Sequence, residues 1–323
     1  MNHTTRLAVE RHIKQWADRF DLWMTVPIAC AALLVLLVVV KSCQGIVYAR
    51  SNECRIQLIG YTPDEARAIA GVLTDEQVDR LIARGEHDTL ACRVINHRYF
   101  IAGNLERYLA YHKSDTAASI NDIIALVNVC ADCKAYETSI PCDTSKGDLM
   151  LINKYHRLAE EYQRQNMVYF NKSCSYSERR AARHVVGAFV KMQDECREQT
   201  GCTLMVSSAY RSYHAQTITH NRSHDNLVAL PGYSEHQTGL ALDVTSLEHP
   251  EKWDFGKSNE GLWMRENCHR FGFILRYPEG KEHITGYNYE PWHLRYVGTD
   301  AARRIHDEGI TLDEYYAYYL VKS

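Results

Sequence analysis

The feature that most constrains this chain is an uncharged, largely apolar stretch over residues 23–40. As a helix, these 18 residues span about 27 Å, near the lower limit for crossing the hydrocarbon core of a bilayer. A cleavable signal peptide would have a shorter apolar region, a shorter segment before it and a small-x-small cleavage site after it. The sequence has none of these features. We therefore predict a transmembrane anchor over residues 23–41, preceded by a cytoplasmic tail over residues 1–22.

Basic residues near this stretch indicate its orientation. Four precede it and three follow it: Arg6, Arg11, Lys14 and Arg19, then Lys41, Arg50 and Arg55. Because basic residues favour the cytoplasmic side of a span, the excess places the N-terminus inside. The sequence thus predicts a single-pass membrane protein whose larger part faces outward.

Cysteines are frequent after the predicted anchor. Nine of them lie beyond residue 50: Cys54, Cys92, Cys130, Cys133, Cys142, Cys174, Cys196, Cys202 and Cys268. These nine cannot all pair with one another, so at least one of these thiols stays free or pairs outside this set. A zinc knuckle around Cys130-x-x-Cys133 lacks a fourth ligand at suitable spacing. We expect at least one disulfide in this outward part, with the pairing left open.

Composition and charge narrow the class of protein. The chain is 46% hydrophobic and 24% charged, close to the averages of folded globular proteins. Lys+Arg 37 against Asp+Glu 40 gives a net charge of −3. This balance gives no electrostatic reason to expect a nucleic-acid partner.

Helix signals dominate the accessory region, which we place at residues 42–148. Thr62 precedes Pro63 and Glu65 in the arrangement of a capping box, and Thr74 precedes Gln77 in the same way. This region therefore reads as a small, mainly helical spacer. Residues 127–129 and 149–153 are expected to be strands around a cysteine-rich turn region.

Residues 149–323 mix helices and strands. We expect helices from Ser177 to Gly201, over residues 263–271, and from Thr299 and Thr311 near the C-terminus; strands are expected at residues 203–207, 240–244, 273–275 and 293–297. The order has no βαβ rhythm. The predicted fold class is α+β, with an antiparallel sheet and flanking helices.

Candidate chemistry concentrates in residues 208–212, 234–243 and 290–293. His236 and Asp243 are about 23 Å apart if extended, whereas two ligands of one zinc ion lie only about 3–4 Å apart. If both bind one ion, the chain must fold back, and Gly239 offers a flexible point. His293 on a neighbouring strand would complete the three-ligand arrangement of catalytic zinc.

Glu290 stands three residues before His293. A carboxylate beside a zinc-bound water can take its proton and later deliver it to a leaving amine. The alternatives are an exposed loop acid for Glu290 and a solvated strand acid for Asp243. With 16 histidines in the chain, a single histidine carries little information, whereas the constellation does. A serine hydrolase is disfavoured because no G-x-S-x-G motif is present.

These motifs resemble the VanY-type D-alanyl-D-alanine carboxypeptidase family of zinc peptidases, which share the patterns S-x-H-x-x-G-x-A-x-D and E-x-W-H. Residues 234–243 and 290–293 match both patterns without gaps. The upstream Tyr-Arg-Ser of residues 210–212, the segment 271–278 and the segment 295–298 are also similar to the family. The resemblance covers roughly residues 149–320. It implies a bacterial envelope protein whose zinc carboxypeptidase domain, residues 149–323, lies outside the cell membrane.

The resemblance also implies roles for individual residues. His236, Asp243 and His293 are expected to bind zinc, with Glu290 as the general base. Arg211, Gln216, Ser234 and Tyr277 are expected to bind substrate. An arginine fork suits a terminal carboxylate, although Arg211 as a structural ion pair and Gln216 as a surface residue are the alternatives.

The expected reaction is removal of the terminal D-alanine from peptidoglycan stem peptides. D,D- and L,D-cleavage both stay open, as do wall turnover and antibiotic resistance as the physiological role. An endopeptidase on the same scaffold and a non-catalytic cell-wall binding module are the alternative functions. The expected partners are stem peptides and the membrane.

Overall fold

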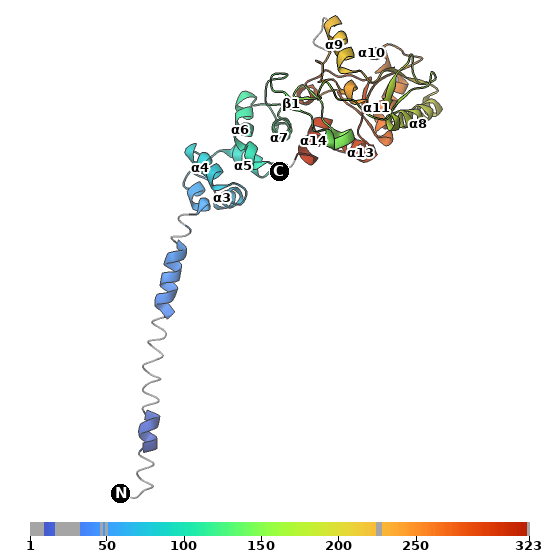
Figure 1. Cartoon of the computed structure of the whole chain (residues 1–323). Helices are drawn as coiled ribbons and strands as arrows, with labels where there is room; N and C mark the ends of the chain where they lie inside the picture. The colour runs from blue at the N-terminus through green and yellow to red at the C-terminus, as the bar shows by residue number, and fades with distance from the viewer. Residues whose placement is uncertain (1–9, 17–32, 46–47, 49–50, 224–227, 322–323) are drawn as a thin grey trace. The chain divides into compact units, whose positions relative to one another are not determined.

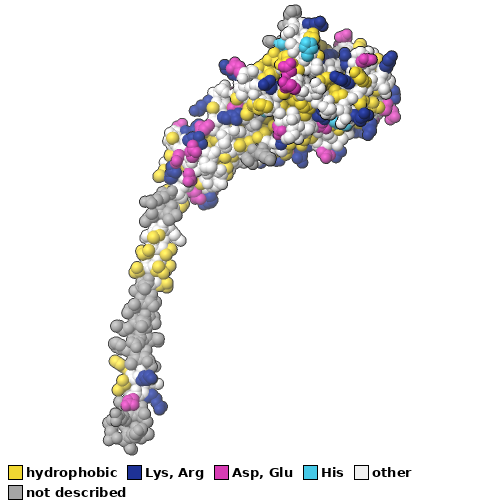
Figure 2. All heavy atoms as spheres, viewed as in Figure 1, with side chains coloured by type: hydrophobic (Ala, Val, Ile, Leu, Met, Phe, Trp, Pro, Cys, Tyr) yellow, Lys and Arg dark blue, Asp and Glu magenta, His cyan; other side chains and the backbone are white. Residues whose placement is uncertain are grey.

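The computed structural model describes residues 10–16, 33–45, 48, 51–223 and 228–321 of the chain (Figure 1). Residues 23–32 of the predicted anchor lie outside these described residues. Residues 33–45 are helical, and the apolar side chains of residues 33–40 are exposed (Figure 2). Within the described ranges, no helix has both the length and the apolar character that crossing a bilayer requires.

Contacts divide the chain into two compact units, Met1–Asn96 and His97–Ser323. The second unit includes helix α7 (Ile120–Asn128), which packs against α14 (Leu312–Tyr319). Ala125 of α7 and Tyr316 of α14 belong to one buried cluster. Residues 97–148, which the sequence analysis groups with the accessory region, thus pack with the C-terminal part of the chain.

The ordered module of the first unit is helical. Its helices are α2 (Asn52–Gln57), α3 (Pro63–Ala70), α4 (Asp75–Ala83) and α5 (Thr89–Ile95). Both predicted capping boxes are present, Thr62 with Glu65 before α3 and Thr74 with Gln77 before α4. Apolar side chains from all four helices are buried, including Ile56, Ile69, Val78, Leu81 and Val94.

The second unit mixes helices with short strands. Its helices are η1 (Ala102–Asn104), α6 (Leu105–Ser114), α7, η2 (Thr144–Leu149), α8 (Arg183–Thr200), α9 (Tyr213–Arg222), η3 (Glu235–Thr238), α10 (Lys252–Phe255), α11 (Asn259–Asn267), η4 (Cys268–Phe271), α12 (Glu282–Thr285), α13 (Thr299–Glu308) and α14. Its strands are β1 (Ile140–Pro141), β2 (His156–Arg157), β3 (Met167–Tyr169), β4 (Arg180–Ala182), β5 (Leu204–Ser208), β6 (Ala241–Ser246), β7 (Phe273–Leu275) and β8 (His293–Tyr296).

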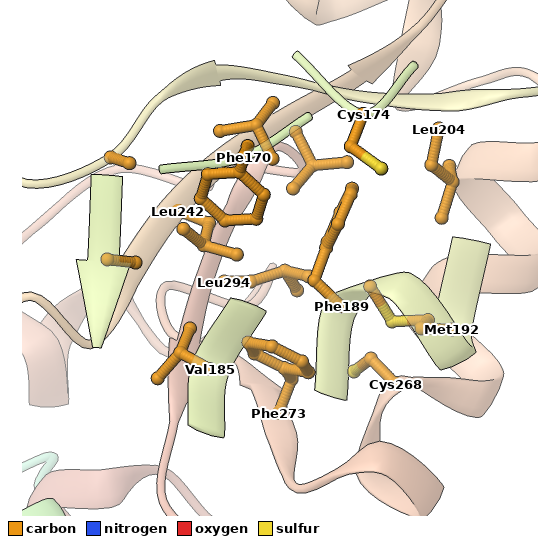
Figure 3. Close-up of a cluster of buried hydrophobic side chains, with 14 of the residues drawn as sticks. Phe170, Cys174, Val185, Phe189, Met192, Leu204, Leu242, Cys268, Phe273 and Leu294 are labelled. Atoms are coloured by element: carbon orange, nitrogen blue, oxygen red, sulfur yellow. The ribbon is translucent and has the colours of Figure 1, made fainter. Parts of the chain in front are cut away.

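The main sheet has four antiparallel strands in the order β5-β6-β8-β7. Helix α8 packs on one face, because its apolar residues recur at helical spacing and point to one side. Figure 3 shows the resulting core, in which Val185, Phe189 and Met192 of α8 meet Leu242, Leu294 and Phe273 of the sheet. The predicted α+β class with an antiparallel sheet is confirmed.

Alternation along β6 places Asp243 on the face opposite Leu242. Contrary to the solvated alternative, this second face is also covered, because η3 and α10 contact β6. All six residues of β6 are buried. An acid in such a strand needs a partner, which the site below supplies.

Two expected strands are wrong. Residues 127–128 end α7, whose start is fixed by a capping box between Ser119 and Asp122. Leu149 ends η2, and residues 150–153 form no strand. Short apolar runs have the same pattern in a buried helix and a buried strand, which explains the error.

The start predicted for the long helix is wrong, but its end is confirmed. Residues Arg180–Ala182 form β4, so α8 begins at Arg183 rather than after Ser177. The helix ends at Gly201, whose φ of +77° is a left-handed conformation that glycine adopts easily.

The expected disulfide is not formed, since all ten described cysteines are free thiols. Cys174, Cys196 and Cys268 belong to the core cluster around α8, where a thiol packs as a small apolar group. Cys202, close to Cys196 in sequence, directs its sulfur to the carbonyl of Thr200 at 3.7 Å. The cysteines of the core therefore serve packing.

Candidate active site

The three predicted metal ligands come together on the covered face of the sheet. His236 lies in η3, while Asp243 on β6 and His293 on β8 are paired residues in the strand register. Asp243 Oδ1 lies 3.5 Å from His236 Nε2 and 3.1 Å from His293 Nδ1. All three residues are 5% exposed. Three donor atoms thus face one another in a buried position.

The chain reverses between His236 and Asp243, as the sequence predicts. Residues Glu235–Thr238 form one short 3₁₀ turn, and Gly239 then adopts a φ of +69°. An added Cβ at Gly239 would lie 2.9 Å from the sulfur of Met167, so this flexible side chain would have to move. Glycine is therefore favoured here chiefly for the backbone angle.

Hydrogen bonds fix which atoms of the ligands face inward. His236 Nδ1 lies 2.6 Å from the carbonyl oxygen of Ala209, an acceptor, so this nitrogen carries the proton and Nε2 is left as a lone-pair donor. The second oxygen of Asp243, Oδ2, accepts from Lys252 Nζ at 2.9 Å. This leaves Oδ1 for the centre of the cluster.

The donor set fits zinc. Ligand atoms of one zinc ion are separated by about 3–4 Å, which the observed 3.1 and 3.5 Å match. Two imidazoles and one carboxylate are common zinc ligands, and three protein ligands are typical of a catalytic rather than a structural site. His236 would bind through Nε2, His293 through Nδ1 and Asp243 through Oδ1.

Electrostatics in the cluster follow from burial and the facing charges. Burial lowers the pKa of His236. Burial also disfavours protonation of His293, but its contacts with the Asp243 and Glu235 carboxylates outweigh this and raise its pKa to about 9. Burial opposes ionisation of Asp243, yet the two histidines hold its pKa well below the usual range. The cluster thus attracts positive charge.

Glu290 lies beside the cluster, not in an exposed loop. Its Oε2 is 3.7 Å from His293 Nδ1, and its side chain is 18% exposed. Its backbone N–H donates to the carbonyl of Tyr277, which fixes the segment before β8. Burial and the nearby Asp243 carboxylate raise the pKa of Glu290. A carboxylate in this place can exchange a proton with a group bound at the ligands.

A cavity of about 420 Å³ opens onto the cluster. The four residues predicted to bind substrate all line it: Arg211, Gln216, Ser234 and Tyr277. Tyr277 is buried, and its ring lies 5.0 Å from the ring of His293. The structure therefore brings all eight predicted site residues to one cavity.

Arg211 is half-buried in this cavity and bonded only to neutral groups. Its guanidinium donates to Gln216 Oε1 at 2.7 Å and to Ser208 Oγ at 3.2 Å. Within the part of the chain that the structure describes, it forms no ion pair, so the structural ion-pair alternative does not hold. Gln216 is 1% exposed, so it is not a surface residue. A cation without a counter-ion in a cavity is available to an anionic ligand.

Several residues of the site were missed from the sequence. Lys252 reaches Asp243 from α10, and its Nζ also lies 4.8 Å from the ring of Trp292. Trp253, 56% exposed, packs its ring edge-on against Trp292 at the cavity. No local spacing pattern distinguishes these residues. Glu235, by contrast, stands inside the motif next to His236, and that position is a signal.

Comparisons with known proteins agree with this site. The sequence profile of the VanY family, described as D-alanyl-D-alanine carboxypeptidase, matches residues 178–299. YodJ of Bacillus subtilis (strain 168) is 38% identical over 181 residues, which cover 52% of this chain and 66% of YodJ. The chain thus spans about two thirds of the length of this curated relative.

A solved structure gives the same relationship. The LdcB LD-carboxypeptidase is 35% identical and matches 57% of this chain and 92% of its own, with a TM-score of 0.52. A D,D-pentapeptidase VanY from a VanB-type vancomycin resistance cassette, solved in complex with Zn(II), is 30% identical and matches 52% of this chain and 98% of its own, with a TM-score of 0.44. This chain belongs to the VanY-type D-alanyl-D-alanine carboxypeptidase family of zinc metallo-carboxypeptidases.

Proposed function

We propose that this protein is a zinc carboxypeptidase that removes the terminal D-alanine from peptidoglycan stem peptides. The observation that carries the proposal is one cavity that holds three convergent metal donors, a partly buried carboxylate and an arginine that has no counter-ion among the described residues. The donors serve metal binding, the carboxylate serves proton transfer, and the arginine serves recognition of a free carboxyl terminus. The family supplies the substrate class.

His236, Asp243 and His293 would hold zinc, which would supply a Lewis acid and lower the pKa of water to about 7. Glu290 accepts the proton of the attacking water as that water adds to the carbonyl carbon of the last peptide bond. The same proton then passes from Glu290 to the departing amine as the C–N bond breaks. The products are free D-alanine and a stem shortened by one residue, and Glu290 returns to its ionised form.

Arg211 positions the substrate. Its planar fork can donate two parallel hydrogen bonds to the terminal carboxylate, as an arginine does with carboxylates generally. Gln216 holds the Arg211 guanidinium in place, because its Oε1 accepts a hydrogen bond from Arg211 Nη1. Because Arg211 N donates to the carbonyl of His236, the anchoring residue and the metal ligand are joined through the backbone. This bond keeps the group that binds the terminal carboxylate at a fixed position relative to the metal ligands.

The direct test uses the full-length chain in detergent with defined tetra- and pentapeptide stems, analysed by mass spectrometry with and without a chelator. Zinc-dependent release of one D-alanine supports the proposal. His236→Ala should lose zinc and activity, and His214→Ala, an exposed histidine on α9, is the matched control. Full activity of His236→Ala, or cleavage inside cross-linked stems only, would overturn it and favour an endopeptidase.

The two stem lengths separate two activities that the similar proteins carry. The VanY profile is described as a D-alanyl-D-alanine carboxypeptidase, whereas LdcB is an LD-carboxypeptidase. A D,D-enzyme shortens the pentapeptide, and an L,D-enzyme shortens the tetrapeptide. Relative kcat/KM values for the two stems assign the specificity of this chain.

We further propose that the catalytic unit is held at the outer face of a bacterial cell membrane by residues 23–41, with residues 1–22 inside. The support is the uncharged stretch at residues 23–40 together with the exposed apolar side chains of residues 33–40. Protease digestion of intact spheroplasts tests the topology. The catalytic unit should be cleaved from outside, and its protection until the membrane is lysed would contradict the orientation.

A further inference from the structure

Glu235 is the most deeply buried carboxylate beside the metal ligands. Its side chain is 0% exposed, and it lies between two arginines that are equally buried. Arg276 Nε donates to Glu235 Oε1 at 2.7 Å, and Arg295 Nη1 donates to the same oxygen at 2.6 Å. One oxygen thus takes both arginines.

The other oxygen, Oε2, is aimed at a metal ligand. It lies 3.6 Å from His293 Nε2, just beyond hydrogen-bond distance. Among the described residues, neither of these two buried atoms has a hydrogen-bond partner. The opposite ring nitrogen of His293, Nδ1, faces Asp243 Oδ1 at 3.1 Å. His293 therefore has one nitrogen toward the metal donors and one toward Glu235.

Histidines that bind metals generally donate their second ring N–H to a carboxylate or carbonyl, which fixes the tautomer and the ring orientation. His236 has the carbonyl of Ala209 for this purpose. For His293, the group in the equivalent place is Glu235. Building on the zinc site of the proposed function, we propose that Glu235 is the positioning residue of His293: its Oε2 accepts the Nε2–H and presents Nδ1 to the metal.

The two arginines explain how a carboxylate can serve in this place. An unpaired buried carboxylate would be neutralised, because removal from water disfavours its charge. Arg276 and Arg295 compensate that charge and leave only Oε2 for the histidine. Each arginine is held in turn: Arg276 Nη1 donates to Asp313 Oδ2 at 2.6 Å, and Arg295 Nη2 donates to the carbonyl of Met150 at 2.7 Å. Asp313 of helix α14 thus holds Arg276 and forms no hydrogen bond or ion pair with a metal ligand among the described residues.

The first experiment observes the unaltered protein, and a variant serves only to assign the signal. Zinc-loaded protein with ¹⁵N-labelled histidine is studied by NMR, and the signal of His293 is assigned by its loss in His293→Asn. The proposal expects a metal-bound Nδ1 and a protonated Nε2 whose hydrogen is shifted downfield and exchanges slowly with solvent. Zinc on Nε2, or a rapidly exchanging Nε2–H, would overturn it.

The second experiment measures zinc affinity by competition with a chromophoric chelator. In Glu235→Gln, the arginines retain the amide oxygen, so the amide N–H₂ faces the His293 N–H, donor against donor. Loss of such a supporting group typically lowers metal affinity about 10- to 100-fold. Asp313→Asn is the matched control, because it weakens the same network without touching His293, and its zinc affinity should stay within about threefold of the unaltered chain.

The outcomes separate this inference from the proposed function. Equal losses of affinity in Glu235→Gln and Asp313→Asn, or none in Glu235→Gln, would make the network structural only and overturn the inference. His236→Ala is measured alongside. If it binds zinc normally, the metal site itself is wrong; if it loses zinc while Glu235→Gln does not, only the role of Glu235 fails. Should Glu235→Gln not fold, the NMR experiment on the unaltered protein decides.

Discussion

The two units of this protein contain ion pairs that lie at very different depths. In the first unit, the ion pair of Arg55 and Asp79 lies at the surface, with side chains 37% and 59% exposed. In the second unit, the ion pair of Arg276 and Asp313 is 0% and 1% exposed. Surface pairs contribute about 0–1 kcal/mol to stability, whereas buried charges cost several kcal/mol each unless they are well compensated.

The contrast shows where function constrains the fold. In the first unit, polar and charged side chains such as Glu65 and Gln77 cap helix ends. Replacing them would change little besides local stability. In the second unit, two hydrogen bonds link buried charges from Asp313 through Arg276 to Glu235, whose Oε2 lies 3.6 Å from the metal ligand His293. Replacing a buried ion pair by apolar side chains of similar volume is often neutral or stabilising, so stability alone does not account for these charges.

The largest expected effect concerns the chemistry itself. Glu290→Gln keeps the shape of the side chain but cannot accept a proton, so kcat should fall about 10²- to 10⁴-fold while zinc content stays unchanged. Stem-peptide kinetics and metal analysis of the same sample measure both. Glu279→Gln, at an exposed acid that does not line the catalytic cavity, serves as the control and should leave kcat unaltered. Near-normal turnover in zinc-loaded Glu290→Gln would remove Glu290 from its role.

The next effect measures the buried pair against the surface pair. Asp313→Ala leaves Arg276 with one carboxylate partner instead of two, and breaking a buried pair costs about 3 kcal/mol or more. Asp79→Ala in the first unit should cost at most about 1 kcal/mol. Urea denaturation followed by tryptophan fluorescence reports the first change, and far-ultraviolet circular dichroism reports the second. Equal costs would end the contrast drawn between the units.

The sequence predicted the parts of this structure that depend on local pattern. The capping boxes at Thr62 and Thr74 join residues three apart, and the strand at β6 follows from simple alternation. The metal ligands were found because they stand in contiguous motifs with a recognisable family resemblance. Within each capping box, strand or motif, the determining residues lie within about ten positions of one another.

The remaining parts depend on contacts between distant segments. Lys252 meets Asp243 only because α10 packs against β6, and no spacing rule anticipates it. Glu235 was inside the quoted motif, but its role depends on Arg276 and Arg295, which are 41 and 60 residues away. The mistaken strand at residues 127–129 also depends on a distant contact. Helix α7 is apolar because it packs against α14, and its short apolar run resembles that of a strand.

In burial, Arg211 lies between the surface pair of the first unit and the buried pair of the second, and its hydrogen-bond partners Gln216 and Ser208 are neutral. If it binds the terminal carboxylate, amidating the stem peptide removes a charge-assisted hydrogen bond of about 1.5–3 kcal/mol, or about 10- to 100-fold in kcat/KM. Arg211→Ala should abolish the preference for the free acid, and Arg211→Lys should restore only part of it, because an ammonium lacks the planar fork. Arg222→Ala, an exposed arginine at the end of α9, should keep the preference. Equal cleavage of acid and amide by the unaltered enzyme would favour an endopeptidase.

The smallest effect tests the surface charges of the first unit, where the third residue ionises in one capping box and not in the other. Glu65 Oε2 accepts from both the backbone N–H and the hydroxyl of Thr62 at 2.9 Å, whereas Gln77 Oε1 accepts from the backbone N–H of Thr74 at 2.9 Å. The bonds from Thr62 lower the pKa of Glu65 to about 2. Because the folded-state pKa lies below that of the unfolded chain, this stabilisation is complete above about pH 4.5 and is lost as the pH falls toward 2.

Thr62→Ala and Thr74→Ala should therefore each lower the stability of the first unit by about 1 kcal/mol at pH 7, the usual cost of losing a threonine cap. Their pH dependence should differ. Thr62→Ala removes the hydroxyl that donates to Glu65, so the pKa of Glu65 moves back up. The difference in unfolding free energy between this variant and the unaltered chain should therefore narrow as the pH falls through the acid range. In Thr74→Ala the partner is the amide of Gln77, which does not ionise, so the difference in unfolding free energy from the unaltered chain should not change with pH. Urea midpoints by circular dichroism at pH 7, 5 and 3 measure both, and parallel pH profiles for the two variants would contradict the ionic part of the Thr62 cap.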